Sequence, residues 1–175
     1  RGVGLLSMGT VLIRMVPPVV VAVPMYVLWT KFGLTGGLSG LVLAYLGLTI
    51  PLNVWMLSIF IKEIPFELEE AAAIDGCSYM RILWGIVVPL IKPGISVTSV
   101  FTFRTAWNEF LLAIILSNRS TRTLPAAVSL MISDLGINWG QIMAMATIIA
   151  IPAFIVTFAC SKNLITGMTA GAVKG

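Results

Sequence analysis

The chain has 175 residues, of which 58% are apolar and only 10% are charged. A soluble domain is about 45–50% apolar and about 25% charged, so too few charged groups remain here to cover a water-facing surface. The net charge of +4 does not indicate nucleic-acid binding, because the lysines and arginines stand singly and form no basic stripe. The composition therefore excludes a soluble enzyme, a disordered segment and a conventional nucleic-acid binder, and it indicates a membrane protein.

Long apolar stretches predict an all-α membrane protein, a single transmembrane domain built as a bundle of about four helices. The expected spans, in chain order, are 8–31, 37–61, 94–116 and 141–161. Stretches of this length can cross a hydrocarbon core of about 30 Å at about 1.5 Å per helical residue. Pro17 and Pro18 are expected to kink or break the first helix, because proline lacks the N–H that a helix interior requires.

The basic residues of the connecting segments predict the orientation. One side carries six of them, namely Arg1, Lys62, Arg81, Lys92, Lys162 and Lys174. The other side carries three, namely Lys31, Arg119 and Arg122. Because lysine and arginine favour the cytoplasmic side, we expect the 62–93 segment and the C-terminus in the cytoplasm and the 117–140 loop outside.

The 62–93 segment differs in composition from its surroundings. It holds five of the chain's seven acidic residues, at positions 63, 67, 69, 70 and 75. Pro65 suits the first turn of a helix, and Gly76 can end that helix in a left-handed conformation. Ser78 is expected to cap a second helix, and Pro89 is expected to stop it. A solvated loop without a partner remains the alternative interpretation of this composition.

The spacing of residues within this segment carries a resemblance to a known family. Glu70-Ala71-Ala72 is followed by three residues, Gly76, nine residues, Ile86, two residues and Pro89. This order resembles the Glu-Ala-Ala signature of binding-protein-dependent ABC importer permeases, with Val88 in place of the family's leucine. The resemblance extends over nearly the whole chain. It is carried further by Arg14-Met15-Val16-Pro17, Trp107-Asn108-Glu109-Phe110, Thr123-Leu124-Pro125 and the tail 167–175.

The resemblance implies a permease subunit of the maltose-type, carbohydrate-importing branch in the inner membrane of a prokaryote. Such subunits typically have six spans with both ends cytoplasmic, of which this chain would supply the last four. The implied partners are a second permease subunit in a heterodimer, two cytoplasmic ATP-binding subunits and an outer solute-binding protein, with lipid around them. No cofactor is implied, and the solute is expected to be a sugar or a related polyol. The residues implied to dock on the ATPase are Glu69, Glu70, Ala71, Ala72, Asp75 and Gly76.

Three polar residues fall inside the third predicted span. They are Arg104, Asn108 and Glu109, and the two charged ones should not face lipid, because a charge at the bilayer centre costs roughly 2.5–3.5 kcal/mol on insertion scales. One hypothesis places them along the translocation path in contact with sugar hydroxyls. The other has them bond one another, neighbouring helices or the partner permease. The sequence leaves both hypotheses open.

Two further function classes are weighed against the importer. An ion-gradient-driven secondary carrier would need ionisable residues in the membrane but no docking loop, and the Glu-Ala-Ala spacing argues against it. A membrane enzyme is disfavoured, because the chain has no histidine and no nucleophile–base constellation. The chain also contains no GxxxxGK[ST] motif, so ATP hydrolysis is expected in a separate subunit.

Overall fold

The computed structural model describes residues 9–10, 12, 15–133 and 136–170, the last ten of these by their backbone alone. The Arg14 part of the family resemblance and the end of the 167–175 tail therefore lie outside the described residues. The first elements in chain order are α2 (Pro18–Lys31), α3 (Leu38–Lys62), α4 (Phe66–Ile74), α5 (Tyr79–Ile82), the π-helical turn η1 (Leu83–Val87) and α6 (Val88–Leu90). They are followed by α7 (Lys92–Trp107), α8 (Leu111–Leu116), α9 (Leu124–Val128), the 3-10 turn η2 (Ser129–Met131), β1 (Ile132–Ser133), β2 (Gly136–Ile137) and α10 (Trp139–Ala170).

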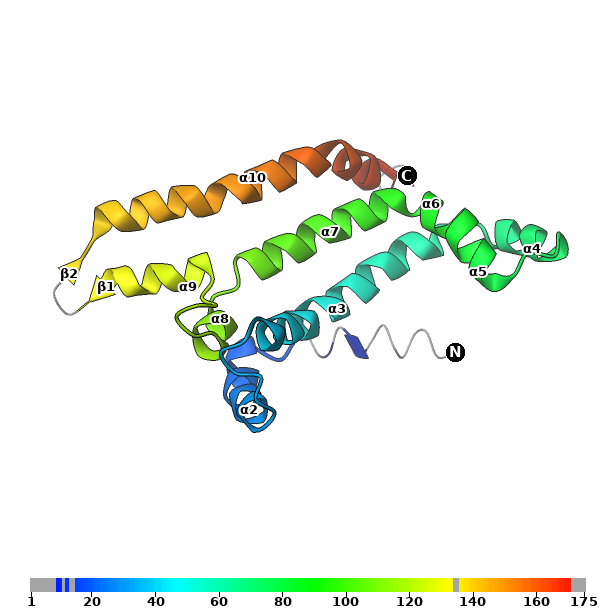
Figure 1. Ribbon diagram of the computed structural model, residues 1–175. Coiled ribbons are helices and arrows are strands. Elements are labelled where there is room, and N and C mark those ends of the chain that lie inside the picture. The colour runs from blue at the N-terminus through cyan, green and yellow to red at the C-terminus, as the bar shows by residue number, and fades with distance from the viewer. Residues whose placement is uncertain (1–8, 11, 13–14, 134–135, 171–175) are drawn as a thin grey trace.

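Three long helices lie side by side, with α7 between α3 and α10 (Figure 1). The short helices α4 and α5 project beyond one end of these three, and the β1–β2 hairpin lies at the other end (Figure 1). The two strands pair antiparallel, Ile132 with Ile137 and Ser133 with Gly136. The predicted all-α class is confirmed, because this hairpin, with two residues in each strand, is the sole strand pair in the described part of the chain.

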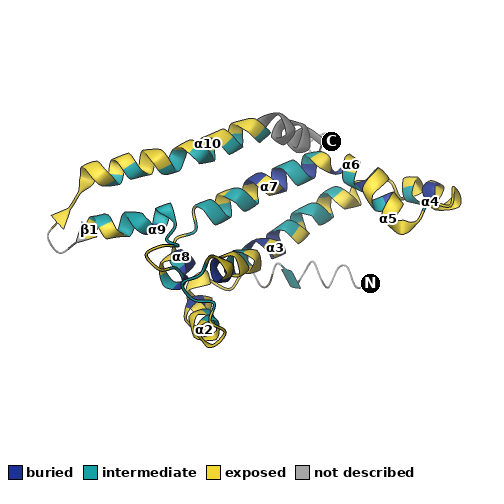
Figure 2. Ribbon diagram, viewed as in Figure 1, coloured by how far each residue is buried: buried dark blue, intermediate teal, exposed yellow. Residues whose placement is uncertain are grey.

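The outer surfaces of the long helices are apolar and uncovered (Figure 2). Examples on α3 and α10 are Val42, Ile148 and Phe154, which are each about half exposed or more. A water-soluble helix would carry polar residues on such a face, so these surfaces suit lipid or other membrane helices. Within the described residues, α3 and the 139–160 part of α10 are each long and apolar enough to cross a membrane alone.

The other two predicted spans have a different form. α2 has 14 residues and begins at Pro18, which agrees with the break expected at Pro17 and Pro18. The expected 94–116 span is divided, because α7 ends at Trp107 and α8 starts at Leu111. A third span arises if residues 79–90 and α7, which are bent by 74° at Ile91, are counted as one.

The expectation that Pro89 ends its helix is wrong. Residues 79–90 stay helical through Pro89, and the chain bends only after Leu90. A proline ring normally clashes with the carbonyl four residues earlier, which here belongs to Gly85. Gly85 lies in the wider π-helical turn of residues 83–87 directly before α6. We attribute the tolerance of Pro89 to this wide turn, because it changes the spacing that produces the clash.

The helices cross closely where glycines remove side-chain bulk. A Cβ atom built on Gly94 of α7 would lie 2.4 Å from the Phe60 ring of α3, so only glycine fits there without displacement. On the other flank of α7, the Trp107 indole N–H donates to the Ile149 carbonyl of α10 at 3.0 Å. These two contacts hold α7 against both of its neighbours.

Candidate coupling surface and membrane groove

The α4–α5 segment is a helix, a left-handed turn and a second helix. Pro65 caps α4 in an extended conformation, and Glu67 and Glu69 lie in its first turn, where the positive end of the helix dipole favours acids. Gly76 has a φ of +77°, as predicted for the residue that ends the helix. The Cys77 N–H bonds the Ala72 carbonyl and the Gly76 N–H bonds the Ala73 carbonyl, each at 3.0 Å. This pair of bonds is the Schellman motif, which requires the left-handed glycine.

The six predicted docking residues do not all face outward. Glu70, Ala71, Asp75 and Gly76 are exposed, and Glu69 is half-buried. Ala72 is only 7% exposed and packs with residues 82, 87 and 91. In this conformation Ala72 holds α4 against the helix that follows, so it supports the exposed face and cannot itself touch a partner.

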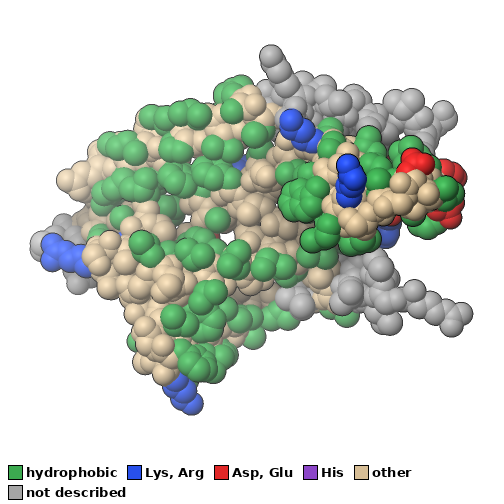
Figure 3. All heavy atoms as spheres, turned by 45° about the vertical axis from the view of Figure 1, so that its right-hand side comes forward, with side chains coloured by type: hydrophobic (Ala, Val, Ile, Leu, Met, Phe, Trp, Pro, Cys, Tyr) green, Lys and Arg blue, Asp and Glu red, His purple; other side chains and the backbone are tan. Residues whose placement is uncertain are grey.

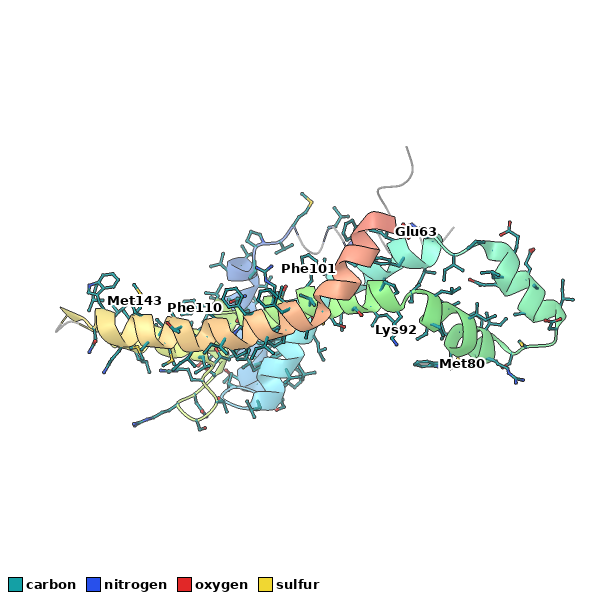
Figure 4. The ribbon with its side chains drawn as sticks, turned by 90° about the horizontal axis from the view of Figure 1, so that it is seen from above. Glu63, Met80, Lys92, Phe101, Phe110 and Met143 are labelled. Atoms are coloured by element: carbon teal, nitrogen blue, oxygen red, sulfur yellow. The ribbon has the colours of Figure 1, made fainter. Side chains whose placement is uncertain are left out.

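Large apolar side chains at the same tip were missed by the sequence reasoning. Ile74 is 87% exposed and Tyr79 is 76% exposed, on either side of Gly76. Met80 of α5 lies beyond Glu63 and Lys92, which flank the neck of this projection (Figure 4). The sequence feature that could have identified these side chains is the position of bulky apolar residues directly beside a polar Asp-Gly turn. Exposed apolar groups of this kind mark interaction sites.

We call the exposed set Glu70, Ala71, Ile74, Asp75, Gly76 and Tyr79 the coupling tip. Acidic side chains gather at this end of the molecule beside hydrophobic ones (Figure 3). An added Cβ on Gly76 would meet no atom within 4 Å, so the centre of the tip is bare backbone. Apolar Ile74 and Tyr79 flank this bare turn, and acidic residues lie beside them. Protein–protein interfaces commonly combine an apolar core with a polar rim in this way.

The three polar residues of the third predicted span separate in the structure. Arg104 and Asn108 are exposed, and the Asn108 side-chain amide donates to the Arg104 carbonyl at 2.9 Å. The Glu109 carboxylate turns the other way. Its two oxygens accept the N–H groups of Leu112 and Ala113, each at 2.9 Å, at the start of α8. Glu109 thereby caps a new helix, which explains why the expected continuous span is divided.

Replacing Glu109 with alanine is expected to destabilise the protein by about 1 kcal/mol, because two N–H groups at the start of α8 lose their acceptor. Glu109→Gln retains one carbonyl oxygen as an acceptor and should lose less. Thermal unfolding of the purified protein in detergent measures both effects. Unchanged stability in Glu109→Ala would contradict the capping role and favour a contact with the transported solute.

Two cavities lie beside α3 and α7 and share Phe103, and the second also extends to Leu124 and Pro125 at the start of α9. The first has a volume of about 400 Å³, and its polar lining is Asn53 from α3 and Thr98, Ser99 and Thr102 from α7. The second has a volume of about 360 Å³ and reaches Tyr45, Trp107 and Thr123. Both fall within the range of about 300–1,000 Å³ that small-molecule sites occupy. We refer to the two together as the α3–α7 groove.

Comparison with known proteins identifies the family. Residues 3–169 match the family model described as binding-protein-dependent transport system inner membrane component. The chain belongs to this family. Its relatives are named as transport permeases and not as enzymes, and the family is one of membrane-embedded components.

Two curated relatives of this permease chain are named for sugars. The diacetylchitobiose uptake system permease protein DasC of Streptomyces coelicolor is 34% identical over 168 residues, which are 95% of this chain and 61% of the relative. The trehalose/maltose transport system permease protein MalG of Thermococcus litoralis is 35% identical over 147 residues, 83% of this chain and 53% of the relative. The chain thus spans little more than half the length of these proteins.

A solved structure supports the fold. The inward-facing MetNI methionine ABC transporter resembles this chain with a TM-score of 0.71 over 89% of the chain and 71% of the matched one. The sequence identity is 19%, so this likeness concerns the arrangement of helices alone. The sequence-based resemblance to importer permeases is confirmed by the family match.

Proposed function

We propose that this chain forms the membrane pathway of an ATP-driven importer and couples it to ATP-binding subunits through the coupling tip. The observation that carries the proposal is the tip itself. It places Ile74 and Tyr79 on either side of a left-handed turn at one end of the helix layer. Two exposed apolar side chains on either side of a bare backbone turn form a surface that another protein can bind.

The packing of the α4–α5 segment would transmit a movement of the tip to α7. α4 and α5 pack on each other through Ala72 and Ile82, and α7 begins directly after this unit at Lys92. A partner that pulls on the tip therefore displaces α7 with it. Closure of an ATPase dimer on the tip would bias the helix layer between two arrangements, since ligand binding shifts conformational equilibria through differential contacts.

The proposed assembly has a second permease subunit, two ATP-binding subunits that hydrolyse ATP on the cytoplasmic side and an outer solute-binding protein. The coupling tip and the end of α10 at Ala170 lie at the same end of the layer (Figure 1), and the 132–137 hairpin lies at the other. With the excess of basic residues that the sequence assigns to the cytoplasmic segments, this arrangement favours a cytoplasmic C-terminus.

The proposed solute is a sugar or a related polyol. The names of the diacetylchitobiose and trehalose/maltose relatives support a carbohydrate. The uncharged hydroxyl and amide lining of the α3–α7 groove supports the same class, because it offers hydrogen bonds without a fixed charge. The proposal assigns no metal or cofactor to the chain.

Cross-linking between the tip and the ATP-binding subunit tests the proposal. In a variant with Cys77 and Cys160 replaced by alanine, Ile74→Cys should form a disulfide with cysteines scanned across the ATPase surface. Glu70→Cys should behave in the same way. Ala72→Cys is the matched control, since Ala72 is 7% exposed and Ile74 is 87% exposed on the same helix.

Two results would contradict the proposal. One is the absence of cross-links from Ile74→Cys and Glu70→Cys at every scanned position of the ATP-binding subunit. The other is uptake of solute by liposomes that contain the permease without ATP-binding subunits but with a proton or sodium gradient. The second result would establish the ion-gradient-driven carrier instead.

A further inference from the structure

An unpartnered buried hydroxyl lies on the α3–α7 groove. Thr98 is only 4% exposed, and its Oγ1 is buried with no hydrogen-bond partner. Tyr45 Oη and Thr123 Oγ1 line the second cavity and are buried close to each other and to Glu109. A buried hydroxyl without a partner costs about 1–3 kcal/mol, so the Thr98 hydroxyl calls for an explanation. Its position on a cavity with other hydrogen-bonding groups indicates an occupant that supplies the missing bond.

The paired groups in the groove leave further donors available. Thr102 Oγ1 lies 2.6 Å from Asn53 Oδ1 across the helix interface and 2.8 Å from the Thr98 carbonyl, so its single proton is shared between these two acceptors. The contact with Thr102 orients the amide of Asn53 and leaves its NH₂ group as a donor toward the cavity that both residues line. Hydroxyls can donate and accept, and an amide adds a fixed donor. The set can therefore match the hydroxyl groups of a sugar in several orientations.

The apolar part of the lining suits the same class of ligand. Phe103 and Trp107 stack with their ring centroids 5.4 Å apart and line the second cavity together. Flat aromatic faces beside hydrogen-bonding groups can hold a ring that has an apolar face and polar edges. No lysine, arginine, aspartate or glutamate lines either of the two cavities. A charged solute would lose its hydration there without compensation.

The groove lies on a different side of α7 from Arg104 and Asn108. Arg104 is two residues beyond Thr102, which places the two side chains about 200° apart around the helix axis. The two faces of α7 therefore carry different chemistry, neutral hydroxyls on one and an exposed guanidinium on the other. The two cavities of the groove lie on the neutral face, and a separate cavity of about 320 Å³ is lined by Thr105 and Glu109.

We propose that an uncharged polyhydroxylated solute crosses the membrane along the α3–α7 groove. Asn53, Thr98 and Thr102 form its hydrogen bonds in the first cavity, and Tyr45 and Thr123 form them in the second. Arg104 and Asn108 lie outside this path. The assignment rests on the proposed transport function and goes beyond it, because it names the residues of this subunit that contact the solute.

Uptake kinetics test the assignment in the full transporter, reconstituted in proteoliposomes with its ATP-binding subunits and solute-binding protein. The probes are labelled trehalose, maltose and diacetylchitobiose, and the kinetics use whichever of these the wild type takes up. Thr98→Val and Thr102→Val remove one hydroxyl each while conserving shape. Each should raise KM roughly two- to tenfold, the equivalent of one lost neutral hydrogen bond.

Stability separates a solute contact from a structural role. Because the Thr98 hydroxyl has no partner in the protein, Thr98→Val should unfold at the same temperature as the wild type or at a higher one. Thr147→Val is the matched control, since Thr147 lies on α10 outside the groove and bonds only its own helix, through the Met143 carbonyl. It should leave KM unchanged. Unchanged KM in both groove variants would overturn the assignment and leave the transport function intact.

A labelling experiment tests whether the groove is open to water in the assembled transporter or is filled by another helix. With Cys77 and Cys160 replaced by alanine, Ser99→Cys should react with a water-soluble methanethiosulfonate in the assembled transporter, because Ser99 is exposed on the groove. Val100→Cys, at a position 4% exposed, should stay unlabelled. A Ser99→Cys variant that stays unlabelled would overturn the assignment. Uptake of none of the three sugars by the wild type would defeat the proposed carbohydrate transport, and the assignment with it.

Discussion

Replacement of Gly76 by valine is expected to uncouple transport from ATP hydrolysis while the protein remains in the membrane. Gly76 has a φ of +77°, a region in which a β-branched residue is a rare outlier. Forcing an ordinary residue into it costs about 1–2 kcal/mol, which lowers the ratio of folded to unfolded turn by a factor of about 5–30. Uptake should fall by up to that factor. The measurements are sugar uptake, ATP hydrolysis and the amount of protein in the membrane.

The effect of Gly76→Val should come from backbone conformation and not from bulk. An added Cβ meets no atom within 4 Å at either Gly76 or Gly85, and only Gly76 has a positive φ. Gly85→Val, in the helix that follows, is therefore the control and should retain most of the uptake. Normal uptake in Gly76→Val would remove the tip from the coupling mechanism. Equal losses in both variants would show that the turn has no special role.

Replacement of Gly94 by alanine is expected to destabilise the crossing of α3 and α7. The new methyl group would lie 2.4 Å from the Phe60 ring, which is closer than real Cβ contacts come. Overpacking of this kind typically costs about 1–3 kcal/mol through displaced side chains and backbone. The groove between the two helices should change shape at the same time. Thermal unfolding in detergent measures the loss, and uptake kinetics report the change in the groove.

A second substitution tests the cause of this loss. Phe60→Leu removes the ring that collides with the new methyl group, so the double variant should recover part of the stability lost by Gly94→Ala. Contacting residues show such non-additive effects, whereas distant ones do not. Gly47→Ala is the control, because a Cβ on Gly47 in α3 meets no atom within 4 Å. Strictly additive losses in the double variant would exclude the Phe60 collision as the cause.

The coupling segment illustrates how far local sequence can predict structure. Pro65, the three alanines and Gly76 specify a short helix and its left-handed end through local backbone preferences, and the structure has both. The inward position of Ala72 and the exposure of Ile74 follow from the packing of α4 on α5. That packing depends on residues up to nineteen positions away, such as Ile91, so a local pattern cannot reveal it.

The polar residues of the membrane helices show where prediction from sequence fails. Arg104, Asn108 and Glu109 stand out in the sequence because they are polar within an apolar stretch. Glu109 turned out to cap α8, and the buried hydroxyls of Thr98 and Tyr45 drew no attention because threonine and tyrosine are ordinary in membrane helices. Only the position of α3 beside α7 shows that the Thr98 hydroxyl lacks a partner and that both residues line cavities.

The sequence by itself determined the membrane setting, the helical class, the Glu-Ala-Ala segment and the family. These properties follow from composition, hydrophobic length and local backbone preference, which need no knowledge of distant contacts. The tertiary structure alone decided where α7 ends, which tip residues are exposed and which polar groups face a cavity. The exposure of the tip residues and the surroundings of the polar groups depend on helices that are distant in sequence and adjacent in space, whereas the end of α7 depends on the cap that Glu109 gives to α8.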